Sequence, residues 1–90
     1  MKVFILGAGR MGAWLVEEFC HQHQVAVYDR DLTKLKYFFN VKRFTDLKQV
    51  TRFKPDLAIN AVSPQHTVAA FEELLPLIPA GCLLADIASV

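Results

Sequence analysis

The sequence predicts an α/β domain built on a doubly wound parallel sheet. Short apolar runs of strand length alternate with segments whose apolar residues recur at helical spacing. Strands that are apolar throughout are typical of sheets covered on both faces, and their alternation with helices indicates parallel pairing. The chain has 90 residues, 53% of them hydrophobic, which suits one domain with one core and argues against disorder.

Five strands are expected from the apolar runs. They cover residues 2–6, 24–29, 41–44, 56–62 and 82–87. The third run, VKRF, is the weakest, whereas the last, CLLADI, is expected to form a buried strand. Because crossovers between parallel strands are right-handed, the expected order in the sheet is 3-2-1-4-5.

Helices are expected between these strands. The first begins at Arg10 and ends near HQH at residues 21–23, with one apolar face that includes Met11. A short helix follows Asp31, a good N-cap, and another covers about residues 46–53. The last begins at Ser63-Pro64, since serine is favoured at the N-cap and proline at the first helical position. Its expected inward residues are Val68, Phe71, Leu74 and Leu75.

Charge and composition exclude several kinds of partner. Ten basic and nine acidic residues are interspersed and give a net charge of +1, so nucleic acid is not an expected partner. The apolar runs are too short to span a membrane. The two cysteines form no motif and the three histidines have no metal-ligand spacing. We therefore expect a cytoplasmic protein without a metal site.

The strongest motif is GAGRMG at residues 7–12, a G-x-G-x-x-G between a predicted strand and a predicted helix. Gly7 permits the tight turn, Gly9 lets a pyrophosphate approach the backbone, and Gly12 lets helix and strand pack closely. The amides of Arg10 and Met11 lie at the helix N-terminus, where a phosphate is favoured. This context predicts a Rossmann-like fold that binds a dinucleotide.

A second part of the site follows the second strand. Asp29 lies twenty residues after Gly9, where a carboxylate accepts hydrogen bonds from the adenosine ribose hydroxyls. The same charge repels a 2′-phosphate, so NAD is expected and NADP is less favoured. Arg30 leaves the alternative open, because a guanidinium there could pair with that phosphate or stack on adenine.

The end of the fourth strand completes the predicted site. Ligands of open α/β sheets bind outside the carboxyl ends of the strands, at the point where strand order reverses. The segment NAVSP lies at that edge, and we expect Ala61, Val62 and Ser63 to contact the cofactor. His66 lies in the first turn of the following helix, near the expected nicotinamide end, but a catalytic role for it is not favoured.

The segments ILGAGRMG, VYDRD and DIASV together resemble the nucleotide-binding domain of prephenate dehydrogenases, the TyrA family. That family carries D-x-(G/A)-S-V-K at the end of this strand, and Asp86, Ala88, Ser89 and Val90 match it. The resemblance implies NAD-dependent oxidative decarboxylation of prephenate to 4-hydroxyphenylpyruvate in tyrosine biosynthesis. It also implies that Ser89 is a catalytic residue that hydrogen-bonds the substrate hydroxyl and a catalytic histidine. The resemblance does not distinguish prephenate from the related arogenate as the substrate.

The resemblance covers all 90 residues, yet a family member continues with more of this domain and a helical dimerisation domain. The family's catalytic histidine and substrate-binding arginine lie in that later part. We therefore expect residues 1–90 to be a truncated NAD(P)-binding domain, inactive alone, whose full-length form is a homodimeric enzyme.

Two other classes remain open. Nucleotide-sensing regulatory domains of potassium transport systems share the glycine motif and a DRD-like end to the second strand. They usually carry an acidic-small-Thr segment after the third strand, and VKRFTDL has none. Other NAD(P)-dependent dehydrogenases and imine or ketone reductases share the fold but not the DIASV ending. FAD is less favoured, because FAD enzymes normally carry Glu where this chain has Asp29.

Overall fold

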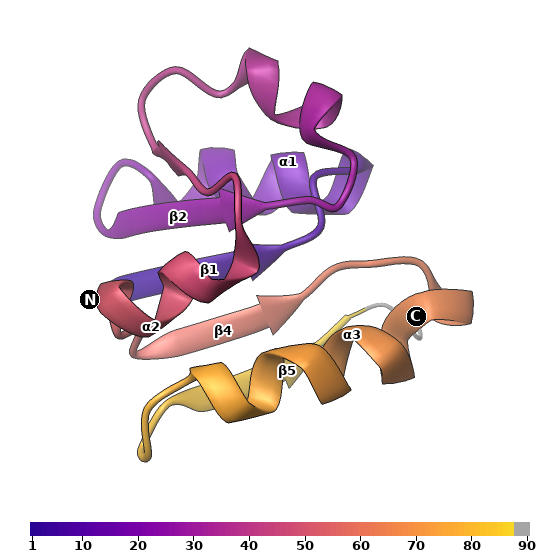
Figure 1. Ribbon diagram of the computed structural model, residues 1–90. Helices are drawn as coiled ribbons and strands as arrows, with labels where there is room; N and C mark the ends of the chain where they lie inside the picture. The colour runs from indigo at the N-terminus through magenta and orange to yellow at the C-terminus, as the bar shows by residue number, and fades with distance from the viewer. Residues whose placement is uncertain (88–90) are drawn as a thin grey trace.

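The computed structural model describes residues 1–87 and contains one five-stranded parallel sheet (Figure 1). The order is β3-β2-β1-β4-β5, which confirms the predicted fold class and topology. The strands are β1 (Lys2–Leu6), β2 (Gln24–Tyr28), β3 (Lys42–Arg43), β4 (Leu57–Asn60) and β5 (Leu83–Asp86). Register places Leu6 between Tyr28 and Asn60, and Asn60 beside Asp86, so the strand ends form one edge.

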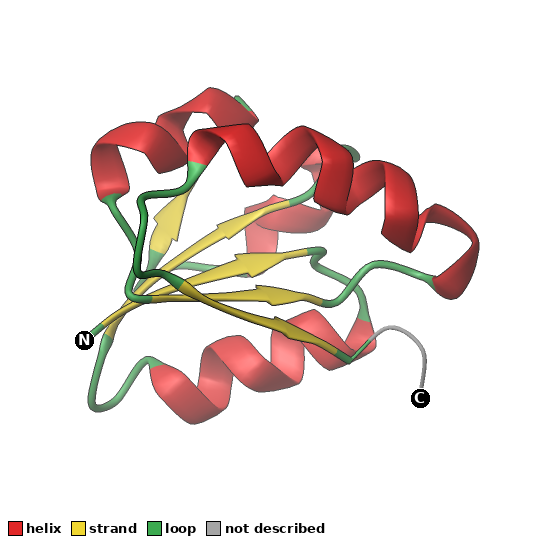
Figure 2. Cartoon of the chain, turned by 90° about the horizontal axis from the view of Figure 1, so that it is seen from below, coloured by secondary structure: helices red, strands yellow, loops and turns green. Residues whose placement is uncertain are grey.

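Helices cover both faces of this sheet (Figure 2). The α-helices are α1 (Arg10–Phe19), α2 (Val50–Phe53) and α3 (Thr67–Leu74). Short 3₁₀ helices accompany them: η1 (Leu32–Tyr37), η2 (Leu47–Gln49), η3 (Pro64–His66) and η4 (Leu75–Leu77). Among residues 1–87, no helix is both long and apolar enough to cross a membrane.

The core lies on both sides of the central strands. On one side, α1 and η1 pack on β1, β2 and β4. Its buried residues are Val3, Ile5, Ala8, Leu15, Val16, Val25, Val27, Leu35 and Ile59. On the other side, α2 and α3 pack on the same strands. The residues buried there are Phe4, Leu6, Ala26, Phe44, Val50, Phe53, Ala58 and Leu74.

The helix expected after Asp31 is the 3₁₀ segment η1. The carboxylate of Asp31 does cap it, accepting from the Thr33 amide at 3.1 Å. Only Leu35 within η1 is buried, whereas Tyr37 is 70% exposed and Phe39, just beyond, is 81% exposed. One buried side chain, that of Leu35, does not stabilise a longer helix, since most helical stability in proteins comes from tertiary packing.

The predicted inward face of α3 was partly wrong. Leu74 is fully buried, but Val68 is 67% exposed and Leu75 is 50% exposed. The stripe that contacts the sheet is Ala70, Leu74 and Leu77, at the helical spacing i, i+4 and i+7. The actual face is therefore rotated from the predicted one.

The prediction that the last strand is buried was also wrong. Leu83 is 68% exposed and Leu84 is 41% exposed. In the described part of the chain, β5 is the edge strand and pairs with β4 alone. An apolar run predicts a strand but does not distinguish a central strand from an edge strand.

Candidate functional site

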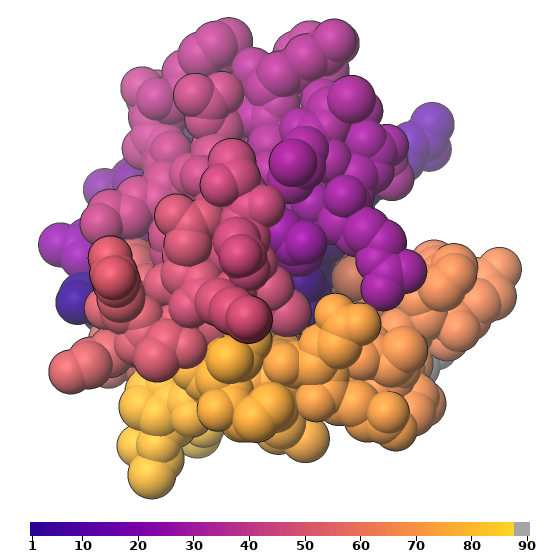
Figure 3. Space-filling model, viewed as in Figure 1, coloured from indigo at the N-terminus to yellow at the C-terminus, as the bar shows by residue number. Residues whose placement is uncertain are grey.

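A cleft of about 500 Å³ opens at the carboxyl ends of β1, β2 and β4. It lies between the segment that follows β2 and helix α3, and Figure 3 shows this hollow with the indigo start of the chain visible inside it. The predicted cofactor residues that line it are Gly7, Gly9, Asp29, Arg30, Ala61, Val62 and Ser63. The structure thus brings together residues from three separate segments, at the place where strand order reverses.

The floor of the cleft is the glycine turn between β1 and α1. Gly7 has φ +107°, and its amide donates to the Tyr28 carbonyl at 2.7 Å. A Cβ at Gly7 would lie 2.9 Å from the carbonyl carbon of Ala61, and one at Gly12 would overlap the carbonyl of Gly7. Only glycine fits these positions, so the turn is held tightly against both the β4 end and the first turn of α1.

Gly9 differs, because a Cβ there would meet no atom within 4 Å. Gly9 is the N-cap of α1, and its carbonyl accepts the Ala13 amide at 2.9 Å. The preceding amides, of Arg10, Met11 and Gly12, have no acceptor within the helix and are available to an anion. The open side of Gly9 leaves room for a phosphate group to reach them.

Arg10 and Met11 are not among the described residues that line the cleft. Both are exposed, and with Trp14 they line a separate shallow hollow. Met11 was expected on the inward face of the helix, but it is 49% exposed, while Gly12, Leu15 and Val16 are buried. Arg10 and Met11 are therefore suited to hold a ligand through their backbone amides.

Asp29 is fixed at the rim by two backbone amides. One carboxylate oxygen accepts from the Ala8 amide at 2.7 Å and the other from the Asp31 amide at 2.8 Å. An ionised carboxylate has about four acceptor sites, so about two remain for hydroxyl groups of a ligand. The bond to Ala8 ties Asp29 directly to the glycine turn, a contact that the sequence motif does not predict.

Arg30 extends across the cleft instead of lying along β2. Its Nη2 is 3.3 Å from Oε1 of Glu73 in α3. Lys34 also lines this end of the cleft. The rim therefore carries two cations and two carboxylates, Asp29 and Glu73 being the acidic members.

A buried polar side chain stabilises the wall of the cleft that follows β4. Asn60, fully buried at the end of β4, donates from Nδ2 to the hydroxyl of Thr67 at 2.8 Å. Its Oδ1 accepts from the Val62 amide at 3.2 Å. The Thr67 hydroxyl in turn lies 3.4 Å from the carboxylate of Asp86. The loop that carries Ala61, Val62 and Ser63 is thus anchored to α3 and to the neighbouring strand end.

Ser63 occupies the N-cap position before Pro64, as predicted, but its side chain does not cap the helix. Its hydroxyl lies 2.9 Å from Nδ1 of His66 instead. The predicted side-chain cap was therefore wrong, because the imidazole engages the hydroxyl that would otherwise reach a backbone amide. Ser63 and His66 are both exposed and both line the cleft.

The predicted catalytic residue, Ser89, lies outside the described residues, as do Ala88 and Val90. Asp86, the first residue of the matched segment, ends β5 beside Asn60. Within residues 1–87 no group of three or more His, Cys, Asp or Glu side chains could hold a metal ion.

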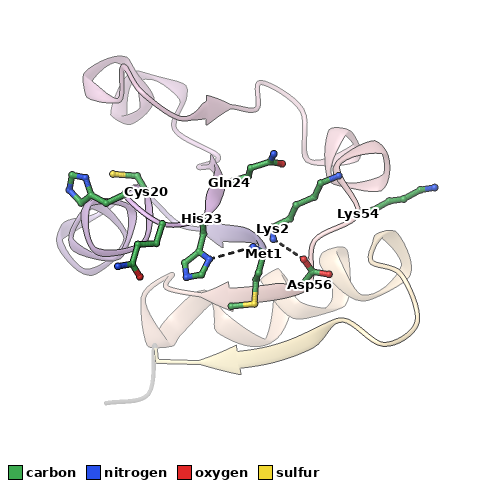
Figure 4. Close-up of a pocket in the computed structure, with 9 residues that line it drawn as sticks. Met1, Lys2, Cys20, His23, Gln24, Lys54 and Asp56 are labelled. Carbon is green, nitrogen blue, oxygen red and sulfur yellow. Dashed lines mark hydrogen bonds between the residues drawn. The ribbon is translucent and has the colours of Figure 1, made fainter.

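A second hollow of similar size, about 510 Å³, lies at the amino ends of the strands (Figure 4). There the Lys2 amide donates to Asp56 at 2.7 Å, and the N-terminal amine is 3.5 Å from Nδ1 of His23. The carboxyl end of α1 faces this hollow near Cys20, and the helix dipole disfavours an anion at that end. The glycine turn lies at the other end of β1, so this hollow does not suit a dinucleotide.

Comparison with known proteins gives a family and a set of similar folds. Residues 2–89 match the family described as NADP oxidoreductase, coenzyme F420-dependent. No curated protein matches the chain.

Solved structures with a similar fold include three oxidoreductases. Synechocystis arogenate dehydrogenase has a TM-score of 0.80 and 20% identity, over 100% of this chain and 34% of that one. Prephenate dehydrogenase from A. aeolicus, in complex with hydroxyphenyl propionate and NAD⁺, has a TM-score of 0.77 and 18% identity, over 96% and 32%. A reductive aminase from Aspergillus terreus, in complex with NADPH and ethyl-5-oxohexanoate, has a TM-score of 0.75 and 22% identity, over 96% and 31%.

At these identities the similarity shows the fold, and the chain spans about a third of each of these proteins. The family match covers nearly every residue, including the glycine turn, Asp29 and the end of β4. This match supports an NAD(P)-binding domain of the dehydrogenase/reductase type. The chain belongs to the family described as NADP oxidoreductase, coenzyme F420-dependent.

Proposed function

We propose that this chain is the NAD-binding part of a dehydrogenase that acts on prephenate or arogenate. The observation that carries cofactor binding is the position of Asp29, held by the Ala8 and Asp31 amides beside the open face of Gly9. A pyrophosphate on the amides at the start of α1 would bring the adenosine ribose to this carboxylate. NAD⁺, when bound, supplies the hydride acceptor for the reaction.

The substrate class rests on the segment DIASV. Its resemblance to the prephenate dehydrogenase motif assigns Ser89 to the substrate hydroxyl. The β5 end that leads to it lies next to the wall of the cleft, since Asp86 is paired with Asn60. The homodimer and the downstream histidine and arginine that the resemblance implies belong to this same proposal.

NAD is proposed over NADP because the fixed charge of Asp29 opposes a 2′-phosphate on the adenosine ribose. One observation favours a second candidate, an NADP-dependent reductase. Arg30 and Lys34 line the same end of the cleft, where they could neutralise that phosphate. A non-catalytic sensing domain is less favoured, because the chain's family is one of oxidoreductases.

Titration of the chain with NADH and with NADPH tests cofactor binding. We expect NADH to bind and NADPH to bind more weakly. Gly9→Ala should leave the fold intact, because its Cβ meets no protein atom, while weakening binding of both nucleotides by filling the phosphate approach. The thermal unfolding midpoint of the same variant is the control for folding. Absence of binding at millimolar NADH would refute the proposal, and tighter binding of NADPH would favour the reductase.

A further inference from the structure

The ion pair between Arg30 and Glu73 crosses the mouth of the cleft. Arg30 follows β2, whereas Glu73 lies in α3, a helix between β4 and β5 in the chain. Their Nη2 and Oε1 atoms are 3.3 Å apart, and both side chains line the cleft. The side chains are 80% and 56% exposed, so this pair contributes little to the stability of the fold.

The same pair is placed to affect an anionic ligand. Arg30 directly follows Asp29, the residue proposed to contact the adenosine ribose, so its guanidinium is the nearest strong cation in sequence for a 2′-phosphate. Glu73 already accepts a hydrogen bond from Nη2 of that guanidinium. A 2′-phosphate would have to displace Glu73 from Arg30, or else share the cleft rim with two carboxylates. A ribose that carries only hydroxyl groups meets neither penalty.

We propose that Glu73 is a specificity-determining residue that favours NAD over NADP by holding Arg30 in an ion pair across the cleft. This inference rests on the proposed function, because it assumes that the adenosine half of a dinucleotide lies at this rim. Glu73 acts through Arg30, as a positioning residue. A bound nucleotide excludes water from the rim, so charge interactions that are weak in the free chain become stronger in the complex.

Glu73→Gln tests the proposal, and Glu72→Gln is its matched control. Glu72 is the adjacent residue of α3, is exposed, and is not among the described residues that line the cleft. Both substitutions remove one negative charge, so their difference isolates the effect of position. Dissociation constants are measured for NAD⁺ and NADP⁺, and for 5′-AMP and 2′,5′-ADP, which probe the adenosine half alone.

Relative to Glu72→Gln, the Glu73→Gln chain should bind NADP⁺ about fivefold more tightly, a change equivalent to about 1 kcal/mol. Affinity for NAD⁺ should change by less than about twofold, because the adenosine ribose of NAD⁺ carries no phosphate that could meet Arg30 or Glu73. The gain should shrink as salt is raised, because the rim is exposed. In an Arg30→Gln background, Glu73→Gln should produce less than about half of this gain.

Equal effects of the two substitutions on the NADP⁺ to NAD⁺ ratio would overturn the proposal, as would a full gain in the Arg30→Gln background. Those results leave dinucleotide binding itself intact, provided that the unaltered chain binds NAD⁺. An unaltered chain that binds neither dinucleotide would instead overturn the proposed function, and this inference with it.

Discussion

Asn60→Ala should destabilise the chain strongly, because Asn60 is the fully buried polar side chain at the end of β4. Its amide group donates to Thr67 Oγ1 at 2.8 Å and more weakly to the Thr67 carbonyl at 3.3 Å, while its carbonyl accepts from Val62. Each well-formed hydrogen bond contributes about 0.5–1.5 kcal/mol to stability, and a buried donor left without an acceptor costs about 1–3 kcal/mol. We expect a loss of about 2–3 kcal/mol in the free energy of unfolding.

That loss is large for a chain of this size. A 90-residue domain has a total free energy of unfolding of roughly 5–13 kcal/mol. Urea denaturation should therefore show a clear fall in the midpoint, and the thermal midpoint should fall by about 10–20 °C. Asn40→Ala, at an exposed asparagine, is the control and should change stability by less than about 0.5 kcal/mol.

A double-mutant cycle separates the hydrogen bond from the size of the side chain. Thr67→Val keeps the shape of Thr67 but removes the oxygen that accepts from Asn60. If the bond is formed in the folded chain, the coupling between the two substitutions should be at least about 0.5 kcal/mol. Additive effects, or an Asn60→Ala chain as stable as Asn40→Ala, would refute the role given to Asn60.

Three further predictions concern Asp29, Asp31 and Ser89. Asp29→Ala should weaken NAD⁺ binding about tenfold or more, since a hydrogen bond to a charged acceptor contributes about 1.5–3 kcal/mol. It should also narrow the difference between the affinities for NAD⁺ and NADP⁺. Calorimetric titration with both nucleotides checks this prediction. The Thr33 hydroxyl and amide hydrogen bonds lower the pKa of Asp31, so its contribution to stability is present above the unfolded pKa of about 3.9 and is lost as the pH falls through the lower folded value. Thermal midpoints from pH 5 downwards should accordingly fall less steeply for Asp31→Asn than for the unaltered chain. In a complete enzyme, Ser89→Ala should lower turnover of prephenate while leaving NAD⁺ affinity nearly unchanged, and unaltered steady-state kinetics would contradict the role implied by the resemblance.

The sheet and its order could be predicted because they follow from local signals and a general rule of handedness. Each strand is a short apolar run, each crossover contains helical turns, and right-handed crossovers leave few topologies. The position of the cleft followed for the same reason, since strand order reverses between β1 and β4. Gly7 and Gly12 were assigned correct structural roles because their positions depend on backbone sterics alone.

The face of α3 that contacts the sheet could not be predicted in the same way. Its sequence, TVAAFEEL, carries apolar residues on several faces, so periodicity does not select between Val68 and Ala70 as the inward residue. Contact with the sheet decides it, and the sheet accepts the small side chain of Ala70. The exposed leucines of β5 were missed for a related reason, because strand sequence does not show how many neighbours a strand has in the described chain.

In the site, too, the parts made of backbone could be predicted and the parts made of side chains could not. Its floor is made of glycine backbone and helix amides, whose position follows from the motif, so the class of ligand could be predicted from the sequence. Its rim and walls depend on side chains that meet only after folding, such as Asn60 with Thr67 and Arg30 with Glu73. Asn60 gave one local signal, a polar residue that ends an apolar strand, but its partner lies seven residues later. We propose that the choice between two dinucleotides that differ by one phosphate is made at this rim. There Arg30 pairs with Glu73 of α3, and the sequence neighbours of Arg30 do not reveal that pairing.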